Sequence, residues 1–423
     1  MPRSGSRWAR RAPAALAGAS LLLGALTGGL AVVQPAEAAG LQARSEGPLQ
    51  AATPAASPVA GARYVALGDS YSAGFGLLPY SQQPAPGCFQ ALEDYPHRLA
   101  AQLQLQLTDV SCSGAATANI IDTPQTTITG EGTAPPQSEA LDASTELVTI
   151  TIGGNDLDLT GVAASCVALG ADGPLLSDPE RNDCRSIYQP DPDDPGGDSL
   201  LARLSGTVEP AIGAAFAQIR SKAPNARVFV IGYPAVAPDA AHVPPEGCFT
   251  SLFQNPLEGS PFRQDAFPFT DVDTAYLHEL GVRLDAVLRA ASASAGFTYL
   301  STLDDTEEHT ACAGPEQAYI FGATVTTDPA DGTKTPLPML YAKLGALHPN
   351  ERGVAYFAER VADAITGRPP PTPDPAPPPS ASVTDPLGLL ARWWPLAALI
   401  AGTAAALIVV LLVLGSRRRR RRR

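Results

Sequence analysis

The chain alternates between short continuous apolar runs and longer segments in which apolar residues recur at helical spacing. Short apolar runs bounded by turn residues are typical of strands buried on both faces, and the longer periodic segments are typical of amphipathic helices. The predicted strands are Tyr64–Leu67, Thr108–Cys112, Leu147–Ile152, Val228–Ile231 and Phe297–Leu300. The predicted helices are Tyr95–Leu105, Leu200–Lys222, Asp271–Ala293 and Glu351–Ile365.

Strands that alternate with helices form a parallel sheet with helices on both faces. We therefore predict one α/β domain over 61–367, with a three-layer α/β/α architecture and a five-stranded parallel sheet in the flavodoxin-like order 2-1-3-4-5. Two long segments rich in Gly, Pro and Asp, 157–199 and 233–270, interrupt this alternation. We expect them to wall the cleft at the carboxyl edge of the sheet.

The N-terminal end of the chain has the pattern of an export signal. Several arginines precede a long apolar stretch and a small-residue site that ends at Ala38. This order predicts a secretory signal peptide over 1–38. The Ala/Pro/Ser-rich residues 39–60 are predicted to be a flexible spacer.

The C-terminal end has the pattern of a membrane anchor. A proline-rich linker over 368–392 is followed by an uncharged apolar segment over 393–415 and by an arginine-rich tail over 416–423. Such a segment is long enough to cross a bilayer as a helix, and the basic tail favours the cytoplasmic side. We predict a single-pass cell-membrane protein whose large domain is extracellular.

Charge and cysteine content exclude some classes of partner and of metal site. The net charge is −13, although arginines are concentrated in the two ends, so the exported part is still more acidic. That surface argues against nucleic acid as a partner. All six cysteines lie in the exported part, where an even number predicts disulfides but leaves their pairing open. None has CxxC spacing, so we expect no zinc, and the acidic loop 191–198 lacks the spacing of a calcium site.

Four short motifs follow predicted strands or precede the last helix. They are Gly68-Asp69-Ser70-Tyr71-Ser72, Ser113-Gly114, Gly153-Gly154-Asn155-Asp156 and Leu347-His348-Pro349-Asn350. Carboxyl ends of parallel strands meet at one edge, where ligands bind. Ester hydrolysis needs a nucleophile, a base and donors for an oxyanion. Ser70 can supply the hydroxyl and His348 the base.

These motifs, in this order, resemble the SGNH (GDSL-type) hydrolase family, and the resemblance spans residues 64–367. It implies that Ser70 is the nucleophile, that His348 is the general base, and that the Ser70 N–H, Gly114 and Asn155 bind the oxyanion. It also implies that no cofactor is needed. The six cysteines are similar to those of the secreted, three-disulfide esterase/lipase branch, which implies the pairs Cys88–Cys112, Cys166–Cys184 and Cys248–Cys312.

One position departs from the family pattern. An aspartate commonly stands three residues before the histidine, and here that position is Gly345. Either a backbone carbonyl at Gly345 orients His348, or an acid such as Asp304 or Asp305 arrives from elsewhere. We favour the Gly345 carbonyl because it fixes the tautomer without a buried charge.

The sequence therefore predicts a membrane-anchored, extracellular serine esterase or lipase that acts on an ester or lipid as a monomer, with no metal. The sequence has no aromatic stripe and no long apolar lid signal, which favours short or medium acyl chains. The alternative is a non-catalytic surface module that binds a glycan or lipid on an SGNH scaffold. Acylglycerols, phospholipids and acetylated glycans all remain open as substrates.

Overall fold

The computed structural model describes residues 59–368, except 192, 259 and 336–338. The predicted signal peptide, apolar segment 393–415 and arginine-rich tail lie outside the described residues, as do nearly all of the spacer and the linker. Within 59–368, apart from those gaps, no helix combines the length and the hydrophobicity needed to cross a bilayer.

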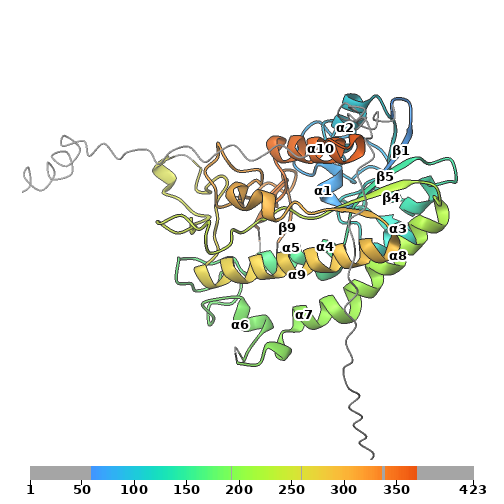
Figure 1. Cartoon of the computed structure of the whole chain (residues 1–423). Coiled ribbons are helices and arrows are strands. Elements are labelled where there is room, and N and C mark those ends of the chain that lie inside the picture. Colours follow the sequence, from blue (N-terminus) through green and yellow to red (C-terminus); the bar gives the residue numbers. More distant parts are fainter. Residues whose placement is uncertain (1–58, 192, 259, 336–338, 369–423) are drawn as a thin grey trace, which may run out of the picture. The chain divides into compact units, whose positions relative to one another are not determined.

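Five parallel strands form the central sheet in the order β2-β1-β5-β6-β7 (Figure 1). They are β1 (Arg63–Gly68), β2 (Gln106–Asp109), β5 (Leu147–Thr151), β6 (Arg227–Ile231) and β7 (Thr298–Leu300). Counted along the chain among themselves, they have the order 2-1-3-4-5, so the predicted fold and strand order are confirmed. The register pairs Gly68 with Thr151 and Ala66 with Asp109, which aligns the carboxyl ends of the three strands that precede the motifs.

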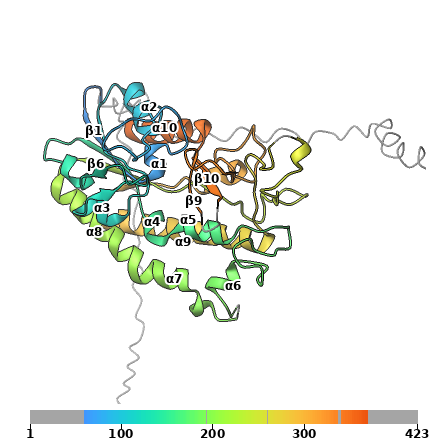
Figure 2. The ribbon, with the colours of Figure 1, turned by 180° about the vertical axis from the view of Figure 1, so that it is seen from behind.

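Helices cover both faces of this sheet (Figures 1 and 2). On one face lie α2 (Tyr95–Leu103) and α10 (Glu351–Thr366), and on the other lie α3 (Thr117–Ile121), α8 (Glu209–Lys222) and α9 (Asp271–Ala295). Alternate residues of β1 explain the two cores, because Tyr64 and Ala66 join the α2/α10 cluster while Val65 and Leu67 join the α8/α9 cluster.

The remaining elements are short. The helices are α1 (Ser70–Ala73), α4 (Gly154–Leu157), α5 (Leu159–Ser165), α6 (Arg185–Tyr188) and α7 (Ser199–Arg203). Short 3₁₀ helices span Gln137–Ala140, Pro195–Gly197, Pro256–Glu258 and Asp304–His309. Two small antiparallel sheets consist of β3 (Gln125–Thr126) with β4 (Thr133–Ala134), and of β8 (Val325–Thr326), β10 (Tyr341–Lys343) and β9 (Gly332–Lys334).

Two predicted elements differ most from the observed ones, and the boundaries of the others agree to within two residues. The edge strand β2 begins and ends earlier than 108–112, although Val110 and Cys112 still donate hydrogen bonds to the carbonyls of Ala66 and Gly68 in β1. The predicted helix 200–222 is divided by a π-helical turn at Leu204–Val208. Pro210, in the first turn of α8, has no N–H to donate and so cannot continue a regular ladder.

Candidate active site

The turn after β1 holds Ser70 in a fixed place. Gly68 has φ +129°, and a Cβ there would lie 2.6 Å from the carbonyl oxygen of Thr151, so only glycine fits. The buried Gln137 side chain accepts from the Gly68 N–H (2.7 Å) and donates to the Gly68 carbonyl (2.9 Å). The chain then enters α1, whose first residue is Ser70.

The buried carboxylate of Asp69 holds this turn through hydrogen bonds. Its carboxylate is 1% exposed and accepts hydrogen bonds from the Tyr71 N–H, the Thr151 hydroxyl and the Tyr233 hydroxyl. Burial raises the pKa of Asp69 from 3.8 to about 6, although these donors oppose the shift. Asp69 is the N-cap of α1. It is not a hydrogen-bond partner of the His348 ring, whose two nitrogens bond to Ala346 and Ser70.

His348 lies against Ser70 with both ring nitrogens engaged. Its Nε2 is 2.8 Å from Ser70 Oγ, and its Nδ1 is 2.8 Å from the carbonyl oxygen of Ala346. A carbonyl only accepts, so Nδ1 carries the proton and Nε2 is free to accept the proton of Ser70. Burial lowers the pKa of His348 from 6.5 to about 4, so the ring is neutral at neutral pH.

A backbone carbonyl bonds to the His348 ring, but it belongs to Ala346 and not to Gly345 as predicted. The Gly345 carbonyl accepts the backbone N–H of His348 at 2.9 Å, and the next carbonyl, that of Ala346, reaches the ring. Gly345 has φ +91°, and a Cβ there would lie 2.9 Å from the Cα of Gly76. The aspartate of the common family pattern therefore has no room at this position.

The two acids that were considered as alternatives do not bond to His348. The Asp305 carboxylate accepts from the Tyr356 hydroxyl at 3.0 Å and pairs with Arg360 at 3.1 Å. Asp304 begins a 3₁₀ turn, and both ring nitrogens of His348 already have other partners. Ser70 and His348 therefore form a pair in which the backbone carbonyl of Ala346, and no acidic side chain, orients the histidine ring.

One aromatic ring from α1 and one from the turn that follows it lie beside the histidine. The ring centroids of Tyr71 and Phe75 each lie 4.9 Å from that of His348. The Tyr71 hydroxyl donates to the carbonyl of Leu347 at 2.8 Å, and Leu347 has a left-handed φ of +59°. These contacts tie the histidine loop to the helix that carries Ser70.

The candidate oxyanion donors follow the two strands that flank β1. Gly114, with φ +85°, follows β2, and its N–H has no hydrogen-bond partner among the residues described. Asn155 lies in α4 after β5 and donates one amide hydrogen to the Ala115 carbonyl at 2.9 Å, which leaves the other available. Asp156 joins the two loops, because it accepts from both the N–H and the hydroxyl of Thr117.

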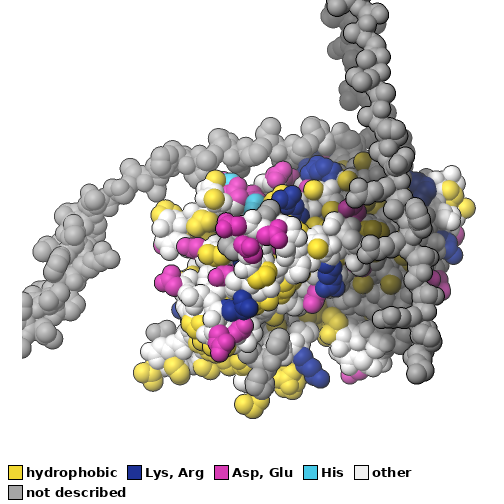
Figure 3. All heavy atoms as spheres, turned by 90° about the horizontal axis from the view of Figure 1, so that it is seen from below, with side chains coloured by type: hydrophobic (Ala, Val, Ile, Leu, Met, Phe, Trp, Pro, Cys, Tyr) yellow, Lys and Arg dark blue, Asp and Glu magenta, His cyan; other side chains and the backbone are white. Residues whose placement is uncertain are grey.

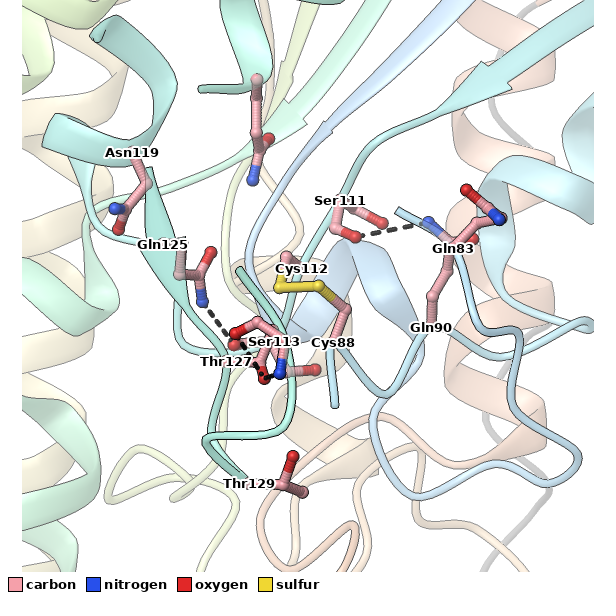
Figure 4. The surroundings of a disulfide bond; sticks show 12 residues. Gln83, Cys88, Gln90, Ser111, Cys112, Ser113, Asn119, Gln125, Thr127 and Thr129 are labelled. Carbon is pink, nitrogen blue, oxygen red and sulfur yellow. Dashed lines mark hydrogen bonds between the residues drawn. A yellow bond between two sulfur atoms is a disulfide. The ribbon is translucent and has the colours of Figure 1, made fainter. Parts of the chain in front are cut away.

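A disulfide supports the Gly114 loop (Figure 4). Cys88 is bonded to Cys112, whose N–H donates to the Gly68 carbonyl at 3.1 Å. Ser113 donates its N–H to the Cys88 carbonyl and accepts from the Gln125 side chain at 2.8 Å. The other bridges join Cys166 to Cys184 and Cys248 to Cys312, so all three pairs are those implied by the resemblance.

Sequence reasoning missed Tyr233. Its hydroxyl accepts from the Gly154 N–H at 3.0 Å and donates to Asp69, so it connects the Ser70 turn to the turn before Asn155. Tyr233 follows β6 by only two residues. Its position at the carboxyl edge of the sheet, where ligands bind, could have predicted that it belongs to the site.

The other histidines have separate partners. His278 Nε2 is 2.7 Å from Glu307, and His309 Nδ1 is 2.8 Å from the Gln317 carbonyl. His97 and His242 each contact an aspartate three residues earlier. Among the described residues, His348 is the histidine that reaches Ser70.

A serine and a neutral histidine at the carboxyl edge of a doubly wound parallel sheet define the serine-hydrolase class. The chain belongs to the GDSL-like Lipase/Acylhydrolase family, whose model matches residues 66–356. The predicted family is thereby confirmed, and with it the prediction of an ester-hydrolysing enzyme.

Known proteins resemble most of this domain. "Lipase 2" of Streptomyces coelicolor is 32% identical over 303 residues, which cover 71% of this chain and 85% of the relative. "Esterase" of Streptomyces scabiei is 28% identical over 316 residues, with the same two coverages. The crystal structure of phospholipase A1 from Streptomyces albidoflavus NA297 has a TM-score of 0.48 and 23% identity, and covers 71% of this chain and 98% of its own.

Proposed function

We propose that the protein hydrolyses carboxylic esters through an acyl-enzyme on Ser70, with His348 as the general base. The observation that carries this proposal is the 2.8 Å contact between His348 Nε2 and Ser70 Oγ, in a ring whose Nδ1–H is held by a backbone carbonyl. That arrangement leaves the basic lone pair directed at the hydroxyl proton.

In the proposed reaction, Ser70 Oγ attacks the acyl carbonyl while its proton passes to His348 Nε2. The N–H groups of Ser70 and Gly114 and the amide of Asn155 bind the negative oxygen of the tetrahedral intermediate. Loss of one such donor costs on the order of 10²–10³ in kcat in other serine hydrolases. His348 then protonates the leaving alcohol, and water, activated by the same nitrogen, releases the acid.

The alternative is a binding module that keeps the same scaffold. A site that only binds a glycan or lipid needs neither a nucleophile nor a base, and Ser70 and His348 are both present and in contact. Acidic side chains are scattered over the face shown in Figure 3, so that face offers no reason to prefer a polyanionic partner. We therefore favour catalysis.

The test uses the full chain in detergent under oxidising conditions, with p-nitrophenyl acetate and butyrate. Turnover should disappear in Ser70→Ala, and a fluorophosphonate should label Ser70. Ser72→Ala is the matched control, because Ser72 bonds to Tyr95 and Thr151 rather than to His348. A wild-type chain that binds esters without turnover would support the binding module.

The relatives named lipase and esterase support ester substrates, and we propose short or medium acyl chains. A panel of esters of increasing chain length tests this choice. We also propose the arrangement read from the ends of the sequence: a signal peptide over 1–38, a spacer over 39–60, an extracellular monomeric hydrolase domain over 61–367 and a linker over 368–392.

The anchor completes this arrangement, with a membrane helix over 393–415 and a cytoplasmic tail over 416–423. The uncharged apolar segment followed by arginines supports it. Truncation before Pro369 should move the activity from the membrane fraction to the medium. Activity that stays in the membrane fraction after truncation would refute the anchor.

A further inference from the structure

A second group of ionisable side chains lies where α2 begins and β2 ends. Asp94 is the N-cap of α2, His97 lies in the first turn of the same helix, and Asp109 is the last residue of β2. The His97 Nδ1 is 2.7 Å from Asp94 Oδ1 and 3.7 Å from Asp109 Oδ2. The side chains of Asp94 and Asp109 are 0% and 3% exposed, while His97 is 34% exposed and closes the group on its solvent side.

Both aspartates have an oxygen without a hydrogen-bond donor. Asp94 Oδ2 and Asp109 Oδ2 are buried, and no N–H or hydroxyl group of the described residues donates to them. No described lysine or arginine forms an ion pair with either carboxylate. Buried carboxylate oxygens are costly unless a positive charge or a donor meets them. Asp94 and Asp109 lie within hydrogen-bonding reach of each other, so without a cation a proton shared between them satisfies these oxygens, and a divalent ion can take the place of that proton.

A comparable cluster elsewhere in the protein is satisfied. Asp239 and His242 repeat the contact between an aspartate and a histidine three residues later, at 2.7 Å, and Glu307 lies beside them. Glu307 Oε1 is bonded to His278 at 2.7 Å, and Glu307 Oε2 accepts the Asp239 N–H at 2.8 Å. That cluster therefore needs no further ligand, and it provides an internal control.

We propose that Asp94, His97 and Asp109 bind a divalent transition-metal ion, with zinc as the best fit. One ligand atom from each residue lies within 4.8 Å of the others, close enough for small adjustments of the side chains to bring all three onto one ion. Two carboxylate oxygens and one imidazole nitrogen are ligands that zinc accepts, with water in the remaining position. Calcium takes about six to eight oxygen ligands and has little use for the imidazole.

The ion would stabilise the loop behind the oxyanion donors. Asp109 Oδ1 accepts from the N–H of Ser111 at 2.9 Å and from its hydroxyl at 2.7 Å, and the chain continues directly into the Cys112 disulfide and Gly114. An ion shared by Asp94 and Asp109 joins the start of α2 to this segment. It takes no part in the hydrolytic steps, so the proposal does not depend on the proposed function.

The spacing of these residues in the sequence does not indicate a metal site. His97 and Asp94 are three residues apart on a helix, but Asp109 comes from a strand, and only the fold brings it to them.

The experiment is a titration of the untagged full chain in detergent, freed of metal with EDTA and then titrated with ZnCl₂ in a calorimeter. We expect about one zinc per chain, and at least tenfold weaker binding in His97→Gln and Asp109→Asn. Asp94→Asn should have the same effect, although asparagine still caps a helix. Both asparagine variants keep the acceptor oxygen that the neighbouring N–H groups use. His242→Gln, in the satisfied cluster, should bind zinc like the wild type.

Absence of zinc binding would overturn the proposal, and so would equal affinity in all variants or loss of binding in His242→Gln. A preference for CaCl₂ over ZnCl₂ would remove His97 from the ligand set and likewise contradict the proposal. Circular dichroism establishes that each variant folds. If an aspartate variant fails to fold, His97→Gln decides, because that side chain is partly exposed and its loss leaves no cavity in the core.

Discussion

Tyr233→Phe is the most informative perturbation of the site, because it removes one oxygen and leaves the ring packed against Tyr71. The change leaves the Gly154 N–H without its acceptor and Asp69 without one of its three donors. An unsatisfied buried N–H costs about 1–3 kcal/mol, and a hydrogen bond to a charged group contributes about 1.5–3 kcal/mol. Both hydrogen bonds use the same hydroxyl, so their free-energy contributions are not additive. We therefore expect the free energy of unfolding to fall by about 2–4 kcal/mol.

Catalysis should suffer as well, because Gly154 immediately precedes Asn155. Complete loss of an oxyanion donor costs about 10²–10³ in kcat. A misplaced donor costs less, so we expect kcat to fall about 10- to 100-fold. The KM should change little, since the oxyanion forms only in the transition state.

Tyr276→Phe separates this effect from general destabilisation. Tyr276 is also a buried tyrosine whose hydroxyl donates to a buried carboxylate, that of Asp198, at 2.9 Å. It should lower stability to a similar degree in urea denaturation while keeping kcat for p-nitrophenyl butyrate within about twofold. If both variants lose kcat equally, or if Tyr233→Phe keeps full kcat, then Tyr233 does not position Asn155.

Three further predictions concern the dyad and its support. The His348 pKa is about 4 when folded and ordinarily 6.5, so between these values the unfolded chain binds more protons and this group makes stability rise with pH. For the same reason kcat/KM should stay high down to about pH 5, and an acid limb near 6.5 in its pH profile would contradict this prediction. Replacing Cys88 and Cys112 by alanine should cost about 2–4 kcal/mol in denaturation and also lower kcat, whereas removal of either other bridge should lower stability alone. Asp305→Asn should keep kcat within about tenfold, because its carboxylate contacts Tyr356 and Arg360; a loss near the roughly 10⁴ seen for triad aspartates would restore a triad.

The sequence was sufficient for the fold and for the Ser70–His348 pair because both depend on order along the chain. Buried parallel strands are continuous apolar runs, and a motif that follows such a run must lie at the carboxyl edge. Edge strand β2 was predicted less well. Its residues alternate between exposed and partly buried, so the apolar signal moved to Val110 and Cys112, beyond the strand.

Contacts that depend on tertiary geometry could not be predicted. Ala346 and Gly345 offer identical carbonyls, and only the turn decides which one meets the ring. Tyr233 acts through its hydroxyl and Gln137 through its side-chain amide, and both bond to residues far away in the sequence. The resemblance indicates which residues belong to the site, but it does not contain these distances.

The exchange of an acid for a carbonyl has a chemical consequence. A carboxylate at Nδ1 would favour the charged imidazolium, whereas the Ala346 carbonyl raises the pKa only weakly and burial outweighs it. His348 is therefore a weaker base than the histidine of a triad, but it stays unprotonated in mildly acidic surroundings. With no carboxylate beside the positive ring, stabilisation of the transition state in the proposed reaction depends more on the donors that bind the negative oxygen. The Cys88–Cys112 bridge and Tyr233 hold the turns that carry the proposed donors Gly114 and Asn155, which is why we expect both to affect kcat.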